Sequence, residues 1–281
     1  MVKLLKYCLR SLIPLAFVVG CNGIGDDPTD NERRGLAENL FEEGSHMGYG
    51  QGSPEVMSQI EKALAMDSTY AEAWRELSVA YLKRGMPHKW KPLFDKAVHF
   101  DPSTWQPWRG YLYLWFYRDY EKAIADFNAS DTLTPYIDYP QGHSVDHWRG
   151  IAYLGLGDYD SSIAYFDKHI KKESEESGED WVELESFLYR GIAHMESGNI
   201  DLAEENFDKI IHYFKNSADA NYYKAKISSQ KGDKKKALEF VRAAIDDFKK
   251  GYFNQRPYIE TLYQVYEDDL FALKATLEYS L

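Results

Sequence analysis

Apolar positions recur three and four residues apart in consecutive segments of the chain, a spacing typical of amphipathic α-helices. Short glycine-bearing turns separate these segments, as in RGIAYLGLGDYDSSIAYF over residues 149–166. Glycine at the end of the first segment supplies the left-handed residue that commonly ends a helix. The glycine–aspartate pair at Gly157 and Asp158 therefore ends the first helix. The pattern therefore predicts pairs of antiparallel helices and an all-α fold.

The pattern is repeated. Similar text surrounds Gly85, Gly198 and Gly232, and the spacings between equivalent apolar residues of the second helices are 33, 39, 41 and 34 residues. These equivalent residues are Phe94, Phe127, Phe166, Phe207 and Val241. We interpret the excess in two intervals as a connection at 134–143 and a solvated helix extension or loop at 171–180. Such repeats stack into a solenoid, because one helix pair cannot bury its own apolar face.

The repeats resemble the tetratricopeptide repeat, a helix–turn–helix unit of 34 residues with the skeleton W-x2-L-G-x2-Y, A-x3-F and P. One unit carries most of this skeleton in Trp74, Leu77, Tyr81, Phe94, Ala97 and Pro102. The later units retain parts of it in Trp108, Ala123, Phe127, Gly150, Tyr153, Phe166, Gly191, Ala203, Phe207, Gly232, Ala237 and Ala244. The resemblance implies an α-solenoid of about five to six units over 37–250. Residues 251–281 are expected to form capping helices, with Pro257 at a first helical position.

The first residues predict export and a lipid anchor. Lys3, Lys6 and Arg10 precede an apolar stretch, which is the anatomy of a signal peptide over 1–20. The stretch ends in VVGC, which resembles a bacterial lipobox and implies cleavage after Gly20 and lipidation of Cys21; the alternative is an ordinary signal with an incidental cysteine. The polar residues 21–36 are interpreted as a flexible tether. Asn22 replaces the aspartate that implies inner-membrane retention, which favours the outer membrane.

The overall charge restricts the partners. The formal net charge is −12, and loss of Lys3, Lys6 and Arg10 would leave 30 basic against 45 acidic residues, a net charge of −15. This charge opposes nucleic acid as a partner. Cys8 and Cys21 are the two cysteines, so the mature chain would contain no disulfide.

No motif indicates catalysis or a cofactor. The chain has no G-x-S-x-G, no C-x-x-C and no glycine fingerprint for a nucleotide. The stretch HSVDH places His143 and His147 at helical i, i+4 spacing without the glutamate of a zinc-protease motif. These two residues are either a metal site or ordinary histidines on a helix surface. We expect neither an enzyme nor a cofactor.

The stretch WQPWRGYLYLWFYRDY, residues 105–120, has eight aromatic residues in sixteen positions. It is either an unusually aromatic core between repeats or, in part, the lining of a concave binding groove. The family resemblance assigns the groove to fixed positions of each first helix. In this chain those positions include Arg75, Lys83, Arg109, Tyr113, Phe116, Tyr117, His147, Tyr222 and Lys226.

A groove that mixes aromatic residues with arginine suits an extended peptide or a partner helix. The family's clamp for acidic chaperone tails uses an asparagine where this chain has Val79, so such a tail is not the expected ligand. We expect a lipid-anchored scaffold for protein–protein interactions in a bacterial envelope. The alternative is a surface lipoprotein that binds glycans or nutrients, since aromatic side chains also stack on sugars.

Overall fold

The computed structural model describes residues 28–279, and within this range the regular elements are helices. They form six antiparallel pairs followed by one further helix. The pairs are α1 (Asp30–His46) with α2 (Pro54–Met66), α3 (Ala71–Lys83) with α4 (Pro87–Phe100), and α5 (Pro102–Leu112) with α6 (Tyr120–Leu133). They continue with α7 (Val145–Leu156) and α8 (Tyr159–Ser177), α9 (Leu184–Glu196) and α10 (Ile200–Tyr213), and α11 (Ala218–Gln230) and α12 (Lys234–Lys249). The last helix is α13 (Glu267–Tyr279), and three short turns are η1 (Tyr113–Tyr117), η2 (Pro140–Gly142) and η3 (Glu179–Trp181).

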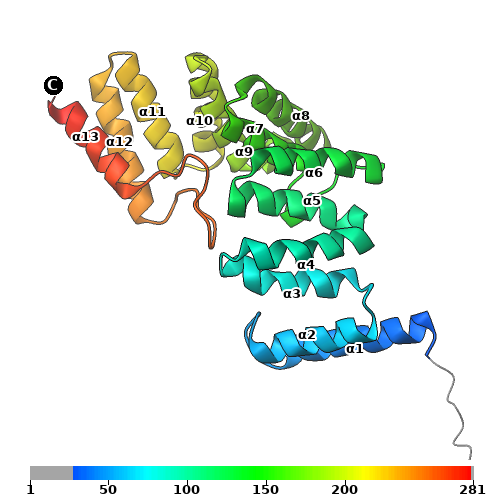
Figure 1. Ribbon diagram of the computed structural model, residues 1–281. Coiled ribbons are helices and arrows are strands. Elements are labelled where there is room, and N and C mark those ends of the chain that lie inside the picture. Colours follow the sequence, from blue (N-terminus) through cyan, green and yellow to red (C-terminus); the bar gives the residue numbers. More distant parts are fainter. Residues whose placement is uncertain (1–27, 280–281) are drawn as a thin grey trace, which may run out of the picture.

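The pairs stack side by side into an arc, with α1 and α2 at one end and α13 at the other (Figure 1). Helix α13 covers the exposed side of the last pair, where Leu277 packs among Ala225, Leu238 and Val241. The segment between α12 and α13 runs along the inner side of the arc instead of continuing the stack (Figure 1). The fold is therefore the all-α solenoid that the repeats predict.

The glycine–aspartate turns end one helix and begin the next. Gly157 adopts φ 76° after α7, and the side chain of Asp158 then accepts a hydrogen bond from the Ser161 amide at 3.1 Å. Gly232 and Asp233 repeat this arrangement between α11 and α12. A positive φ suits glycine, and an aspartate at the N-cap satisfies one of the unpaired amides of the new helix. Gly157 is thus an architectural residue.

Glycines inside the first helices allow the two helices of a pair to come close together. A methyl group at Gly150 would lie 2.9 Å from three ring atoms of Phe166, and one at Gly191 would lie 2.7 Å from the ring of Phe207. Both phenylalanine rings are completely buried. The glycine of the first helix therefore makes room for the aromatic ring of the second.

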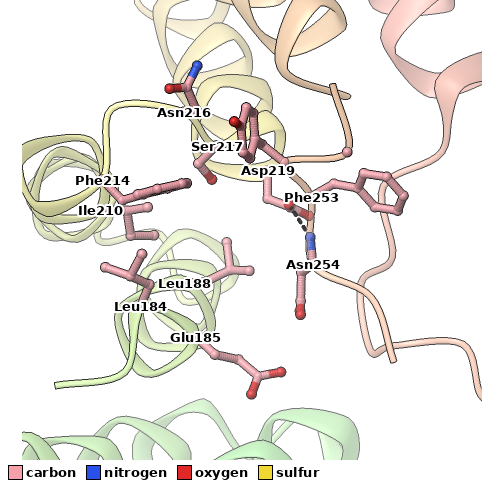
Figure 2. Close-up of a pocket in the computed structure, with 12 residues that line it drawn as sticks. Leu184, Glu185, Leu188, Ile210, Phe214, Asn216, Ser217, Asp219, Phe253 and Asn254 are labelled. Atoms are coloured by element: carbon pink, nitrogen blue, oxygen red, sulfur yellow. Dashed lines mark hydrogen bonds between the residues drawn. The ribbon is translucent and has the colours of Figure 1, made fainter. Parts of the chain in front are cut away.

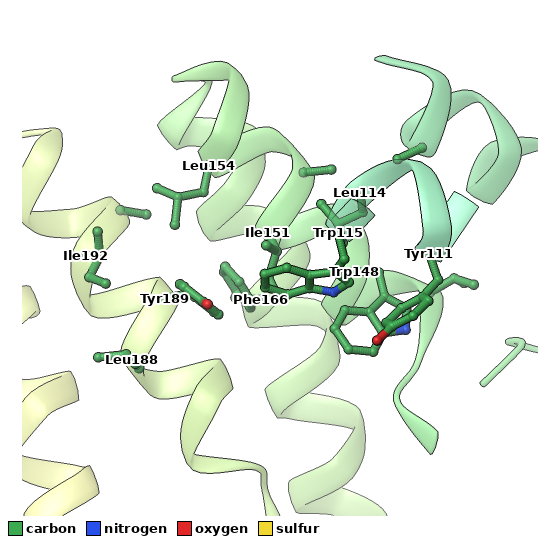
Figure 3. Packing of buried hydrophobic residues seen from close by; sticks show 14 of the residues in the cluster. Tyr111, Leu114, Trp115, Trp148, Ile151, Leu154, Phe166, Leu188, Tyr189 and Ile192 are labelled. Carbon is green, nitrogen blue, oxygen red and sulfur yellow. The ribbon is translucent and has the colours of Figure 1, made fainter. Parts of the chain in front are cut away.

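The aromatic stretch 105–120 lies mostly in the core. Trp105, Tyr111, Tyr113 and Trp115 are buried, and the remaining aromatic residues pack against the same cluster. Figure 3 shows how Tyr111 and Trp115 meet Trp148 of the next pair, with ring centroids 5.1 Å and 6.2 Å away. Rings of this size each bury about 150–250 Å². The core interpretation of this stretch holds for these four residues.

Two expectations about the ends of the array are wrong. The predicted tether reaches to residue 36, but helix α1 already begins at Asp30, because Thr29 and Glu32 form a reciprocal capping box that nucleates it. Pro257 does not begin a helix: it lies in a turn between Arg256 and Ile259, which face each other in an isolated antiparallel bridge. The predicted signal peptide over 1–20 and Cys21 lie outside the described residues.

The two irregular intervals between repeats have different structures. Residues 171–177 extend α8, so the excess charge here lies on a helix extension. Residues 134–144 form a connection that contains η2. Within residues 28–279, no helix is long and apolar enough to cross a membrane.

We predict that Gly150→Ala destabilises the protein by about 1–3 kcal/mol, because the added methyl group overpacks against the Phe166 ring. Gly35 in α1 is the matched control: an added methyl group there meets nothing within 4 Å. Gly35→Ala should stabilise the protein by up to about 1 kcal/mol through helix propensity. Urea unfolding followed by circular dichroism measures both. Equal stability of Gly150→Ala and the wild type would contradict the close-approach account.

Candidate functional site

The inner side of the arc holds a segment of the chain itself. We call residues 252–266, between α12 and α13, the strap; it is the orange segment of Figure 1. It begins at α11, where the Ala218 amide donates to the carbonyl oxygen of Tyr252 at 2.8 Å. The backbone amide of Asn254 then donates to the buried carboxylate of Asp219 at 2.7 Å, and its side-chain amide donates to the hydroxyl oxygen of Tyr189 at 3.0 Å. The strap is thus bound through both main-chain and side-chain groups.

Arg256 is the deepest charged contact of the strap. Its guanidinium carbon lies 4.7 Å from the ring centroid of Trp115 and 5.0 Å from that of Trp148, and its Nη2 donates to Oε2 of Glu185 at 2.6 Å. These three partners come from η1, α7 and α9. We call Trp115, Trp148 and Glu185 the arginine site. Its two indole rings meet at 90° and form a corner for a planar cation.

A widened helical turn supplies one wall of this site. Trp115 lies in η1, a π-helical turn that ends at Arg118, which has left-handed backbone angles. Single π-turns occur frequently at functional sites because they redirect side chains from the regular helical positions. Arg118 also reaches the strap, where its Nη2 donates to the carbonyl oxygen of Glu260 at 3.0 Å.

The tip of the strap reaches the second repeat pair. The Pro257–Tyr258 turn places Tyr258 at φ 70°, a position where glycine is preferred. Tyr258 is 73% exposed, and Nζ of Lys83 at the end of α3 lies 4.9 Å from its ring centroid. From α11 to α3, the strap therefore follows the inner side of most of the array.

The returning half of the strap is tied to the first half. Nε2 of Gln264 donates to the carbonyl oxygen of Asn254 at 3.0 Å, and the hydroxyl of Thr261 donates to Oε1 of Gln264 at 2.7 Å. Thr261 and Val265 are buried. The two halves form one ordered unit on the inner side of the arc.

Two buried carboxylates under the strap differ in their electrostatics. Burial raises the pKa of Asp219 to about 6. Burial also opposes ionisation of Glu185, but the neighbouring His147 and the charge of Arg256 hold its pKa below the usual value. Glu185 is therefore the charged partner of the guanidinium, whereas Asp219 serves mainly as an acceptor for backbone N–H groups.

A cavity of about 240 Å³ lies beside the first half of the strap. Figure 2 shows apolar side chains of α9 and α10 on one side and the hydrogen bond between Asp219 and Asn254 on the other. Its lining comprises Leu184, Glu185, Leu188, Ile210, Phe214, Asn216, Ser217, Asp219, Gly251, Tyr252, Phe253 and Asn254. An apolar wall opposite a few polar groups is the usual composition of a pocket for a side chain or small ligand.

Two of the residues predicted for the groove are buried, and these predictions are wrong. His147 is 0% exposed; its Nδ1 pairs with the Ser186 hydroxyl at 2.8 Å, and its Nε2 lies 3.5 Å from Glu185. Tyr113 is 6% exposed and packs edge-on against Trp90 at 5.7 Å. Contacts between neighbouring repeats use both positions, so neither side chain offers a surface to a partner.

The other predicted groove residues keep some exposure, and their contact with a partner stays a prediction. Arg109 pairs with both carboxylate oxygens of Asp126, at 2.7 Å and 2.8 Å. Arg75 pairs with Glu76, and Nζ of Lys226 lies 5.5 Å from the ring centroid of Tyr222. The remaining partly buried aromatic residues, Phe116 and Tyr117, pack against the core. Lys83 is a member of this predicted set that contacts the strap, through the ring of Tyr258.

The sequence interpretation missed the arginine site and the strap. Trp115 lies in the aromatic stretch, but its position in a π-turn is not visible in helical periodicity. Arg256–Pro257 carried a usable signal, since a proline disfavours helix for the residue before it. From the sequence, Pro257 is interpreted as the first residue of a helix, whereas it lies in a turn. Partners far apart in sequence, such as Glu185 and Arg256, cannot be paired without the curvature of the array.

The two histidines of HSVDH differ in burial: His147 is buried, whereas the side chain of His143 is 25% exposed. Within residues 28–279, no group of three or more histidine, cysteine, aspartate or glutamate side chains is arranged to hold a metal ion. His143 pairs with Glu183 at 3.0 Å, and His169 pairs with the other oxygen of the same carboxylate at 2.9 Å. His147 stacks on His143 at 5.0 Å. These histidines join α7, α8 and the start of α9.

The helix pairs, the glycine turns and the curved stack define an α-solenoid of the helical-repeat class. A sequence profile of the tetratricopeptide repeat matches residues 189–251, and a second profile of the same family matches residues 147–171. These segments match the tetratricopeptide repeat, and the described residues have the fold of a tetratricopeptide repeat array. No curated protein matches the sequence.

Solved structures share this fold. PilW, described as a widely conserved type IV pilus biogenesis factor, is 18% identical over 76% of this chain and 94% of its own, with a TM-score of 0.61. PilF of Pseudomonas aeruginosa is 15% identical over 78% of this chain and 97% of its own, with a TM-score of 0.58. YrrB, described as a TPR protein with an unusual peptide-binding site, is 19% identical over 67% of this chain and 91% of its own, with a TM-score of 0.50.

We predict that His147 makes the protein less stable as the pH falls below 6.5. Burial lowers the pKa of His147 to about 4, so between pH 6.5 and 4 the unfolded chain takes up a proton that the folded chain does not. Stability from this residue is fully present above pH 6.5 and is lost through that window. His147→Gln lacks this titrating group and should not show the loss. The difference in the free energy of unfolding between the wild type and His147→Gln should therefore shrink by on the order of 3 kcal/mol between pH 7 and pH 4.

Denaturant unfolding at a series of pH values measures this difference. Asp219 and the other titrating groups are common to both proteins and largely cancel in the comparison. Parallel stability profiles of the wild type and His147→Gln would show that His147 does not titrate in this way.

Proposed function

We propose that this protein is a scaffold that binds an extended peptide of a partner protein along the inner face of its repeat array. Tetratricopeptide repeat proteins bind protein or peptide partners and are generally not enzymes. The observation that carries the proposal is the strap. Its main chain and side chains follow a path from α11 to α3. An extended peptide ligand would follow the same path.

The contacts of the strap are of the kinds that give peptide recognition. An acceptor for a backbone N–H group, Asp219, fixes the main chain, while Glu185 and the two tryptophans of the arginine site select a side chain. Buried aromatic residues and arginines dominate the energetics of many interfaces. YrrB, whose fold is similar, is described as having a peptide-binding site, although a likeness at 19% identity concerns the fold alone.

The alternative of a glycan-binding protein loses its main support. It depended on exposed aromatic platforms in the stretch 105–120, but Trp105, Tyr111 and Trp115 are buried against neighbouring repeats. Trp108 is only partly buried, but Arg75 covers its ring, with the guanidinium carbon 5.4 Å from the ring centroid. A peptide ligand accounts for the inner face better.

We further propose that the scaffold is held at a bacterial membrane, on the outer membrane, by lipid attached to Cys21. The lipobox-like VVGC after an apolar stretch supports this proposal. Eight residues separate Cys21 from Asp30, where α1 begins, and at most about 3.6 Å each they span no more than about 30 Å. The anchor would therefore keep the first repeat close to the membrane surface.

For the anchor, we predict that Cys21→Ala moves the protein from the membrane fraction to the soluble fraction of a bacterial expression host. Loss of the acyl chains removes on the order of 0.8 kcal/mol of membrane affinity per buried CH₂ group. Cell fractionation with metabolic labelling by a palmitate analogue measures both effects. A labelled or membrane-bound Cys21→Ala protein would refute the lipoprotein proposal.

For peptide binding, we predict that a photo-crosslinking residue at Lys83 or Lys226 captures one and the same envelope protein in intact cells. Lys83 lies beside the tip of the strap, and Lys226 is on α11, the helix whose Ala218 amide binds the start of the strap. Lys171 on α8 is the control, since its side chain is 75% exposed and is on a second helix. Capture at Lys171 but at neither inner position would place the binding surface elsewhere.

A further inference from the structure

We propose that the inner face recognises an arginine of the partner peptide at the site that Arg256 now occupies, so that the strap is an internal ligand which the partner displaces. This inference rests on the proposed peptide-binding function and names the chemistry of the partner. The motif that the strap presents is Asn254-Gln255-Arg256, an asparagine and an arginine separated by one residue.

The arginine site fits a guanidinium better than an ammonium ion. Trp115 and Trp148 present ring faces at 4.7 Å and 5.0 Å to one planar cation, and Glu185 lies at the edge of the guanidinium, 2.6 Å from Nη2. A guanidinium can stack on an aromatic ring while it donates in its own plane. A lysine ammonium is a strongly hydrated point charge and cannot satisfy both requirements equally well.

The arginine site is only partly satisfied by the strap. Nε of Arg256 and Oε1 of Glu185 are both buried without a hydrogen-bond partner, although a guanidinium and a carboxylate can form two parallel bonds. The strap also contains two tyrosines with positive φ, Tyr258 at 70° and Tyr263 at 53°, and such angles cost energy for bulky residues. An arginine on an unconstrained peptide could form both bonds without these turns.

A second contact fixes the register of the peptide. Asn254 is bound through its backbone to Asp219 and through its side chain to Tyr189, whereas Gln255 is exposed. Alternate residues of an extended chain point to opposite sides, so Asn254 and Arg256 face the array together. A partner peptide with the same spacing of asparagine and arginine would reproduce both contacts.

The strap can leave the inner face while the end of the array stays covered. Leu273 and Leu277 hold α13 against α11 and α12 in a cluster that contains no strap residue, whereas Leu270 of α13 lies in the main core cluster with Val265 of the strap. The strap is tethered at both ends, so it competes at an effective concentration of roughly millimolar. A partner must therefore offer more than one contact, which the paired asparagine and arginine provide.

The test uses a fluorescent peptide with the sequence of residues 252–259 and the chain from residue 22 onward, titrated by fluorescence anisotropy. In Asn254→Ala/Arg256→Ala both strap side chains are removed, and the peptide should bind roughly tenfold or more tightly than it binds the wild type. Gln255→Ala is the matched control and should behave as the wild type, because its side chain is exposed. Circular dichroism establishes that each variant is folded.

The chemistry of the ligand is tested with altered peptides. Replacement of the peptide arginine by citrulline, which is neutral and of the same shape, or by lysine should weaken binding to the double variant by roughly tenfold or more. Addition of Glu185→Gln to the double variant should remove the preference for arginine over citrulline. A purely structural role of Glu185 would lower stability without changing this preference.

The proposal is overturned if the folded double variant binds no more tightly than the wild type, or if it binds the arginine and citrulline peptides equally. Should the double variant not fold, Arg256→Lys retains the charge, and the arginine peptide should still gain several-fold in affinity over the wild type; no gain overturns the proposal. In cells, crosslinks at Lys83 are compared between the wild type and Glu185→Gln. Unchanged crosslinks in Glu185→Gln would agree with the peptide-binding function but would refute the arginine site. Absence of crosslinks in the wild type would refute the function itself.

Discussion

The contact between a glycine of the first helix and a phenylalanine of the second holds together the three helix pairs from α5 to α10, and the rest of the structure depends on it. At Gly150 and Gly191 there is no space for even a methyl group beside the buried rings of Phe166 and Phe207. This close approach lets adjacent pairs stack face to face, and one continuous core extends from α3 to α13. Stacking of such units accumulates into an arc with an inner face.

The inner face is formed by elements that the arc brings together. Glu185, Trp148 and Trp115 belong to three successive first helices or their extensions, yet they surround a single guanidinium. Each of these residues also contributes to packing between repeats. A partner that binds here therefore contacts residues whose positions the core already fixes, so the site is preorganised and little side-chain entropy is lost on binding. Packing between the repeats fixes the position of Glu185, and the carboxylate of Glu185 pairs with the cation of Arg256.

Much of the fold could be predicted from the sequence, because the repeat skeleton is local. The glycine–aspartate turn at Gly157 and the alanine–phenylalanine spacing of the second helices both act within about 34 residues. The binding face could not be predicted in the same way. His147 and Tyr113 occupy helix positions that face a groove in the family pattern. In this chain both are buried, and they pack against the rings of Trp148 and Trp90. The partnership of Arg256 with Glu185 spans 71 residues and depends on how far the arc curves.

The central claim is that the strap and a partner peptide occupy the same face in turn. Hydrogen–deuterium exchange of the wild-type chain, with and without a saturating concentration of the arginine peptide, tests it most directly. The account predicts that amides of residues 252–266, including the Asn254 amide now bonded to Asp219, exchange faster when the peptide is bound, while α12 and α13 remain protected. Unchanged protection of the strap in the peptide-bound protein would contradict the claim.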